Sequence, residues 1–216
     1  SKKAYELFDY YNAIEIDPNY PVEEKKKQMH IWWSKHLQLI VDSKLHRNII
    51  DQVANSGIMV LRNWMKELFT NLNNKNIPVV IISANWLGLD SIKTYLEFEQ
   101  SLFDNIHVVW NSFTFWSDWY VTWYKSEIVH VFNKDETALD QFPEIHDKVE
   151  SRKNVILLWD SLWDVWMIEG FNYDSLIKIG FLNDKQEELL ESYLEKYDLV
   201  VTGDWWMQFF EDLNII

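Results

Sequence analysis

The chain has 216 residues and a mass of 26.1 kDa, enough for one mid-sized domain with its own core. Its 20 Lys plus Arg against 34 Asp plus Glu give a formal net charge of −14, which repels polyanions and disfavours a nucleic-acid polymer as partner. The absence of Cys excludes disulfides, thiolate catalysis and Cys-ligated zinc. No apolar run approaches the roughly 18 residues of a membrane span, and the first residues do not resemble a signal peptide. We therefore expect a soluble, cytoplasmic protein without a membrane partner.

The balance between glycine and tryptophan is unusual. The chain has 5 Gly and 13 Trp, whereas an average protein has about 7% Gly. Glycine normally occupies turns that need a positive φ. Several tryptophans occupy such turn-like positions. The sequence therefore predicts turns in which bulky tryptophan takes the place of glycine.

The first part of the chain has the apolar spacing of helices. We expect helices over residues 4–11, 21–40, 45–53 and 58–73. The segment from Asp17 to Pro21 breaks the chain between the first two, and Pro21 suits the first turn of the second.

From Pro78 onward, short runs rich in β-branched residues replace the helical period. These runs occupy residues 79–82, 106–109, 128–132, 155–158, 176–179 and 199–201. Helical stretches lie between most of them, at residues 87–103, 184–197 and 205–213. This alternation predicts a doubly wound α/β fold with a parallel sheet, and residues 112–125 predict a β-hairpin inserted beside it.

Polar residues follow three of the predicted strands, at the sheet edge where α/β proteins bind ligands. Ser83 and Ala84 precede a helix and offer a hydroxyl and main-chain amides to an anion, and Lys134 is a flexible cation. Asp160 and Asp164 have a spacing that can hold one Mg²⁺.

Each of these residues also has a structural interpretation. Ser83 alone is more often a helix cap, and Lys134 alone a solvated surface lysine. For the two aspartates taken alone, capping or solvation is as good an interpretation as metal binding. His130, inside a predicted strand, is more simply a hydrogen-bonded core histidine. The ordered combination of Ser, Lys and two Asp favours a phosphate site.

This order of motifs resembles the haloacid dehalogenase superfamily, and most closely its cytosolic 5′-nucleotidase III, or pyrimidine 5′-nucleotidase, family. Five stretches carry the resemblance: residues 11–25, 77–84, 127–134, 157–164 and 177–188. It implies a helical cap over residues 1–62 and a three-layer α/β core over residues 63–216, which lacks the first strand of the family's sheet. It also implies Mg²⁺-dependent hydrolysis of pyrimidine nucleoside 5′-monophosphates to nucleoside and phosphate, through an aspartyl-phosphate.

The resemblance assigns roles to the strand-end residues. Ser83 and Ala84 would bind the phosphate, Lys134 would bridge the phosphate and the nucleophile, and Asp160 and Asp164 would hold Mg²⁺. Asp164 and Lys134 are thus the catalytic candidates within the chain.

In the cap, Trp32 is a candidate substrate contact, since indoles can stack on nucleotide bases. The alternative is that Trp32 belongs to the cap core, because aromatic stripes at helical spacing usually pack.

The sequence departs from the family pattern in two ways. It contains no D-x-D-x-T, the motif that supplies the nucleophile and the general acid, and Trp159, Trp163 and Trp166 stand where the family has small or acidic residues. We therefore expect impaired activity, with the nucleophile strand supplied by an N-terminal segment outside this sequence or by a companion chain. The alternatives are a catalytically inactive or engineered nucleotide-binding scaffold on the same fold, and a partner-binding surface made of the Trp patches.

Overall fold

The computed structural model describes most of the chain. The described residues are 2–17, 19–85, 87, 89–124, 128–134, 139, 142–162, 168, 170–203 and 210. They fall into two compact units, each described here by itself. Unit 1 comprises Ser1–Met59, Ile82–Gln100 and Val108–Asn133, and unit 2 comprises Val60–Ile81, Ser101–His107 and Lys134–Ile216. These units do not test the predicted division into cap and core.

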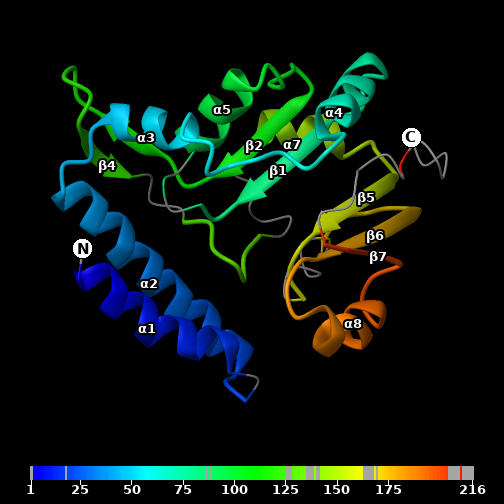
Figure 1. Cartoon of the computed structure of the whole chain (residues 1–216), viewed down its shortest axis with the longest axis horizontal. Helices are drawn as coiled ribbons and strands as arrows, with labels where there is room; N and C mark the ends of the chain where they lie inside the picture. Colours follow the sequence, from blue (N-terminus) through cyan, green and yellow to red (C-terminus); the bar gives the residue numbers. More distant parts are fainter. Residues whose placement is uncertain are drawn as a thin grey trace. The chain divides into compact units, whose positions relative to one another are not determined.

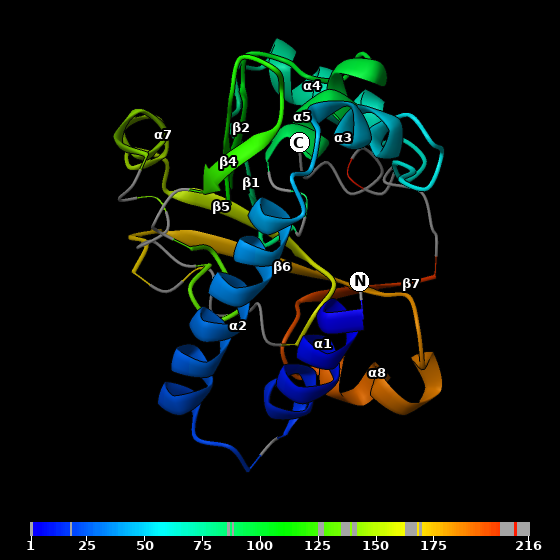
Figure 2. The same cartoon turned by 90° about the vertical axis from the view of Figure 1, so that its left-hand side faces the viewer.

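Unit 1 begins with an antiparallel pair of helices, α1 (Lys2–Ile16) and α2 (Val22–Asp42), which lie side by side in Figures 1 and 2. Met29 and Trp32 of α2 are buried, and the Trp32 ring stacks on Tyr11 of α1 with the ring centroids 5.8 Å apart. The predicted helices and the break between them are confirmed. The apolar stripe of each helix covers that of its neighbour, which is why helices of this spacing form here.

A buried lysine joins the two helices. Lys25 of α2 is 1% exposed, and its Nζ donates a hydrogen bond to the main-chain oxygen of Glu15, 2.7 Å away, near the end of α1. Its ammonium also lies 5.8 Å from the centroid of the Phe132 ring. Burial lowers the pKa of Lys25, and the negative charges of Asp17 and Glu15 oppose that shift. A cation at the last carbonyls of α1 also complements the helix dipole.

Unit 1 also contains the helices α3 (Arg47–Ala54) and α5 (Leu89–Phe98) and the hairpin formed by β3 (Phe113–Phe115) and β4 (Val121–Tyr124). Arg47 and Asp90 join the two helices through an ion pair of 3.4 Å. Burial raises the pKa of Asp90, partly offset by Arg47. Strands β3 and β4 are antiparallel, so the predicted hairpin is confirmed.

The strand predicted at residues 128–132 is wrong. This segment is buried but forms no strand, because side-chain amides take the hydrogen bonds that a neighbouring strand would make. Asn111 donates to the carbonyl of Val129 at 2.8 Å and accepts from its N–H at 2.7 Å. Asn133 binds the main chain at residues 128 and 130 in the same way. A buried main chain needs partners, but those partners can be side chains.

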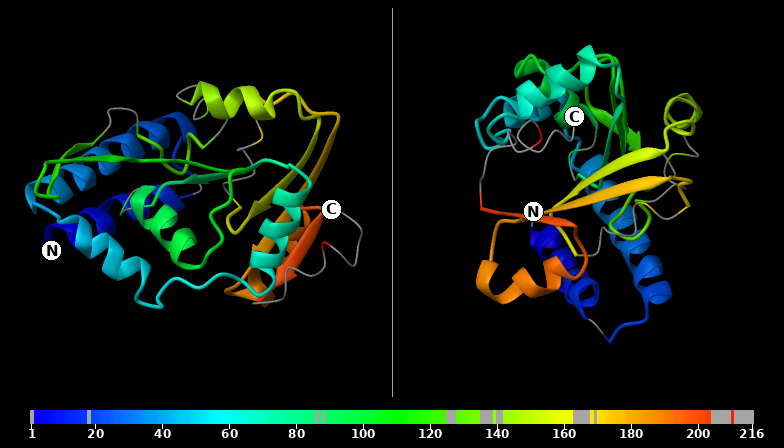
Figure 3. Two further views of the ribbon diagram at one scale, coloured as in Figure 1. Left: turned by 90° about the horizontal axis from the view of Figure 1, so that it is seen from above. Right: turned by 90° about the vertical axis from the view of Figure 1, so that its right-hand side faces the viewer.

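Unit 2 is built on a parallel sheet of strand order β5-β6-β7. Its elements are α4 (Met65–Asn74), α7 (Pro143–Val149), β5 (Asn154–Trp159), β6 (Ser175–Leu182), α8 (Gln186–Leu194) and β7 (Leu199–Thr202). Helix α8, orange in Figures 1 and 3, packs beside β6 and β7. Leu68 and Leu72 of α4 form one core cluster with Ile179 and Phe181 of β6.

Two further strands, β1 (Val79–Ser83) and β2 (Ile106–Trp110), form a two-stranded sheet, and the chain passes between the units within them. Some predicted bounds change. The helix predicted over residues 58–73 begins at Met65, and the one predicted over residues 87–103 ends at Phe98. Helix α7 was not predicted. The helix predicted over residues 205–213 lies outside the described residues, except Phe210, which is buried in the core.

Within the described part of the chain, no helix combines the length and the apolar character that crossing a membrane requires.

Replacing Asn111 by Ala should destabilise the protein, because the N–H and the carbonyl of Val129 would both lose their partner. We expect a loss of about 2 to 4 kcal/mol in the free energy of unfolding, measured by urea denaturation. Asn55→Ala, at an exposed asparagine of the same unit, is the control and should change it by less than about 0.5 kcal/mol. Equal effects of the two variants would show that the amide bridge contributes nothing.

Among the tryptophans that the structure describes, two have the left-handed backbone that favours glycine: Trp64 with φ 68° and Trp119 with φ 65°. Trp64 packs against the core of unit 2, whereas Trp119 is 56% exposed at the turn between β3 and β4. The structure therefore bears out the prediction of tryptophan in a glycine-type turn at Trp119, whereas Trp64 lies in a segment that was predicted to be helical. A left-handed conformation costs a residue with a side chain roughly 1 to 2 kcal/mol.

Trp119→Gly should therefore raise the free energy of unfolding. The net gain is about 0.5 to 1 kcal/mol, because glycine also gives the unfolded chain more conformational entropy, which offsets part of the relieved strain. Trp116→Gly is the matched control, since Trp116 lies in the same turn, is 68% exposed and has no positive φ. That variant should lower stability by about 0.5 to 1 kcal/mol. Thermal and urea unfolding measure the stability of both variants. A loss of stability in Trp119→Gly would refute the strain argument.

Candidate active site

The carboxyl end of strand β5 brings two of the predicted site residues into one neighbourhood of unit 2. Trp159 is the last residue of β5, and Asp160 follows it with its side chain exposed. Nζ of Lys134 lies 4.9 Å from the centroid of the Trp159 ring. The predicted lysine therefore lies against the residue that precedes the first predicted aspartate, at the sheet edge where parallel strands bind ligands.

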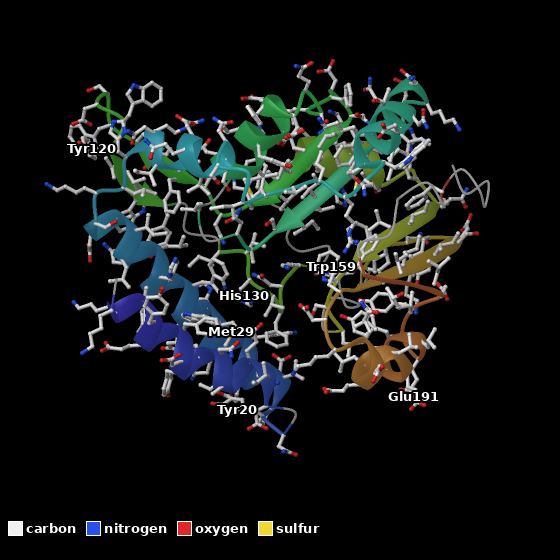
Figure 4. All side chains as sticks on the ribbon, in the orientation of Figure 1. Tyr20, Met29, Tyr120, His130, Trp159 and Glu191 are labelled. Carbon is white, nitrogen blue, oxygen red and sulfur yellow. The ribbon has the colours of Figure 1, made fainter. Side chains whose placement is uncertain are left out.

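The indole of Trp159 fills space at this edge. Its ring packs beside a buried cluster of Leu182, Tyr193 and Tyr197, and Figure 4 shows it at the end of β5. No described residue accepts a hydrogen bond from its buried Nε1. The Lys134 ammonium lies over the face of this ring and makes a cation–π contact with it. Such an attraction is worth about 0.5 to 1 kcal/mol at a partly exposed site.

Ser83 and Ala84 belong to unit 1, at the carboxyl end of β1. Both are partly buried, and no described residue hydrogen-bonds to the Ser83 hydroxyl. Instead, Asn85 organises the start of the next helix: its side chain accepts from the N–H of Leu87 at 2.9 Å and donates to Ser91 at 2.8 Å. Sequence reasoning missed this turn around Asn85, although Asn commonly binds the main chain two residues on in turns.

Trp32 is 5% exposed, and besides stacking on Tyr11 it meets the Phe8 ring edge-on at 6.0 Å. This burial matches the interpretation of Trp32 as part of the cap core. His130, 4% exposed, accepts a hydrogen bond at Nδ1 from the N–H of Phe132 at 3.2 Å, which confirms a hydrogen-bonded core histidine.

The chemistry of Asp160 fits the predicted Mg²⁺ site, since magnesium prefers carboxylate oxygens. The main-chain oxygen of Asp160 accepts a hydrogen bond from the Tyr193 hydroxyl at 2.7 Å, and its carboxylate belongs to an exposed residue. The second predicted ligand, Asp164, lies outside the described residues, as do Trp163 and Trp166.

A different cluster of possible metal ligands, His146, Asp147 and Glu150, lies at α7. Two of its three members are exposed, and none belongs to the predicted site. Clusters of this kind are common on protein surfaces without an ion.

A known protein family matches almost the whole chain. Residues 1–214 match the model of the family "Pyrimidine 5'-nucleotidase (UMPH-1)". The chain belongs to this family. The family resemblance given by the strand-end motifs is thereby confirmed, and with it the membership of the haloacid dehalogenase superfamily.

Individual members of the pyrimidine 5′-nucleotidase family support this conclusion. The chain is 35% identical over 205 residues to the 7-methylguanosine phosphate-specific 5'-nucleotidase of Mus musculus, covering 94% of this chain and 67% of the mouse protein. The Homo sapiens enzyme of the same name is 36% identical over the same length and coverage.

A solved structure of the family confirms the predicted fold class. The crystal structure of cytosolic 5'-nucleotidase IIIB bound to cytidine has a TM-score of 0.87 with 31% sequence identity, over 98% of this chain and 70% of that one. The α/β class, with N-terminal helices and parallel strands, is therefore established.

Proposed function

We propose that this chain carries most of the phosphate and magnesium site of a nucleoside 5′-monophosphate phosphatase, which releases nucleoside and phosphate through an aspartyl-phosphate. The observation that carries the proposal is the contact of Lys134 with Trp159, the residue before Asp160 at the carboxyl end of β5, in a chain of the pyrimidine 5′-nucleotidase family. Residues 1–62 would be the cap and residues 63–216 the core.

The residues have distinct roles in this proposal. The ammonium of Lys134 neutralises the phosphate and the nucleophilic carboxylate. Ser83 and Ala84 donate to phosphate oxygens through a hydroxyl and the main chain. Asp160 and Asp164 hold Mg²⁺, which when bound stabilises the negative charge on the transferring phosphoryl group. Trp32 is assigned to the packing of the cap, because it is buried against α1.

The nucleophile is the missing part of this site. The sequence has no D-x-D-x-T, and among the described strands β1 pairs only with β2, and β5 only with β6. Each of these two strands thus has an edge that no described strand covers, and exposed edges readily pair with further strands. This supports a nucleophile strand supplied by a segment outside the given sequence or by a companion chain.

The names of the relatives suggest the substrate class. One relative is named for 7-methylguanosine phosphate and another was crystallised with cytidine, so the base must be determined by testing both kinds of nucleotide. The word cytosolic in a relative's name supports a cytoplasmic location.

A second candidate function is nucleotide binding without catalysis. The contact between Lys134 and the Trp159 ring favours it, because a phosphate must compete with the indole for the ammonium. This candidate predicts binding that persists when a nucleophile strand is supplied, without turnover.

Binding of phosphate and cytidine monophosphate tests the site. In calorimetric titration with Mg²⁺ present, Lys134→Ala should weaken both by at least about tenfold, because a charge-assisted hydrogen bond is worth roughly 1.5 to 3 kcal/mol. Lys148→Ala, which removes an exposed lysine of the same unit, is the control and should leave both affinities unchanged.

The same preparation should not turn over cytidine, uridine or 7-methylguanosine monophosphate, since the chain has no nucleophile motif. Phosphate release at about 1 to 10³ per second would show that the nucleophile lies within the 216 residues. Equal phosphate binding by the Lys134→Ala and Lys148→Ala variants would overturn the assigned site.

Trp159→Leu should strengthen phosphate binding by about 2- to 5-fold, because it removes the ring face that competes for Lys134 and keeps an apolar side chain in the cluster. Trp110→Leu is a matched control: Lys93 lies over the Trp110 ring at 5.1 Å, but neither residue belongs to the site. Titration with inorganic phosphate should detect no change in that variant. A weaker affinity in Trp159→Leu would mean that the indole supports the site instead of competing with it.

A further inference from the structure

Helix α8 and the residues just after it hold the loop that follows β5 at three successive positions. The Tyr193 hydroxyl donates to the carbonyl of Asp160 at 2.7 Å, and the Tyr197 hydroxyl donates to the carbonyl of Ser161 at 2.6 Å. Nζ of Lys196 donates to the carbonyl of Leu162 at 3.2 Å. Tyr193 lies in the last turn of α8, and Lys196 and Tyr197 follow the end of the helix, where both of their N–H groups hydrogen-bond to the carbonyl of Tyr193.

We infer that Tyr193 and Tyr197 are positioning residues for the Asp160 carboxylate. The inference rests on the proposed function, in which Asp160 binds the metal. Neither tyrosine touches the phosphate or the ion in this proposal. Each acts by fixing the main chain from which the ligand projects.

The physical argument concerns the direction of the carbonyls. The chain bends at Asp160 and turns at Leu162, so these groups no longer belong to the sheet ladder. With their carbonyls held by these three side chains, the residues of the loop cannot rotate their peptide planes without breaking a hydrogen bond. The exposed side chain of Asp160 is thereby left with a fixed starting direction, which is how outer residues usually tune a metal ligand.

Both tyrosines are themselves held firmly. Each is 4% exposed, and their rings stack with centroids 5.4 Å apart. Tyr197 also packs on Gly180 of β6 so closely that a Cβ there would lie 2.6 Å from the Tyr197 ring. A rigid donor restricts its acceptor more than a mobile one would, so this packing is suited to positioning.

Binding of Mn²⁺, a spectroscopic substitute for Mg²⁺, tests the inference by electron paramagnetic resonance. Tyr193→Phe and Tyr197→Phe remove one hydroxyl each and keep the packed ring. We expect each to raise the Mn²⁺ dissociation constant by about tenfold. Tyr173→Phe, at a tyrosine of the same unit that is 39% exposed, is the control and should leave the constant unchanged.

A second background separates positioning from general stability. In a protein that already carries Asp160→Asn, adding Tyr193→Phe should raise the Mn²⁺ dissociation constant no further, because the effect of Tyr193 acts through the Asp160 carboxylate. Hydrogen exchange of the amides at residues 160–162 should be faster in both Tyr→Phe variants, even where melting temperatures barely change.

The outcomes distinguish this inference from the function on which it rests. If Asp160→Asn weakens Mn²⁺ binding but neither Tyr→Phe variant does, the positioning role is wrong and the metal assignment stands. If Asp160→Asn binds Mn²⁺ as the unaltered chain does, or if the unaltered chain binds none, the metal assignment fails and the inference fails with it. An additional loss from Tyr193→Phe on the Asp160→Asn background would also overturn the inference.

Discussion

The close approach of α8 to β6 sets the geometry of unit 2. At Gly180 a side chain would lie 2.6 Å from the Tyr197 ring, so only glycine allows this tyrosine to lie flat on the strand. The main chain of Lys178 is bonded in turn to Asp198, one residue beyond Tyr197. Because the chain just after α8 is fixed to β6 in this way, the hydroxyls of Tyr193 and Tyr197 reach the carbonyls of the loop after β5. The exposed Asp160 thus depends on a glycine in the neighbouring strand.

The tryptophans of this chain have at least three physical situations, which composition alone does not separate. Trp32 is a packed core residue between α1 and α2. Trp119 occupies an exposed left-handed turn, where its side chain contributes strain and little burial. Trp159 lies at the site, where its ring is attractive to the very lysine that the family resemblance assigns to phosphate. Tryptophan therefore stabilises the packing of two helices at Trp32, strains the main chain at Trp119, and at Trp159 competes with phosphate for a lysine.

Membership of the pyrimidine 5′-nucleotidase family and the absence of the nucleophile motif are compatible in physical terms. A phosphate site is assembled from several strand ends, each of which folds by its own local packing. Lys134 and Asp160 hold their places through contacts within unit 2, with the Trp159 ring and with α8. Much of such a site can therefore form around a strand that the given sequence does not contain.

The sequence by itself determined the elements that follow from periodicity: the helices α1 and α2, the hairpin, and the runs that became β5, β6 and β7. It also determined the family, because the strand-end residues are contiguous motifs. The tertiary structure alone decided that residues 128–132 form no strand, since the amide of Asn111, 18 residues away from Val129, supplies the hydrogen bonds. It alone also revealed the hold of Tyr193 on Asp160, 33 residues apart. Periodicity reports which face of a segment is buried, whereas partners distant in sequence are chosen only when the chain packs.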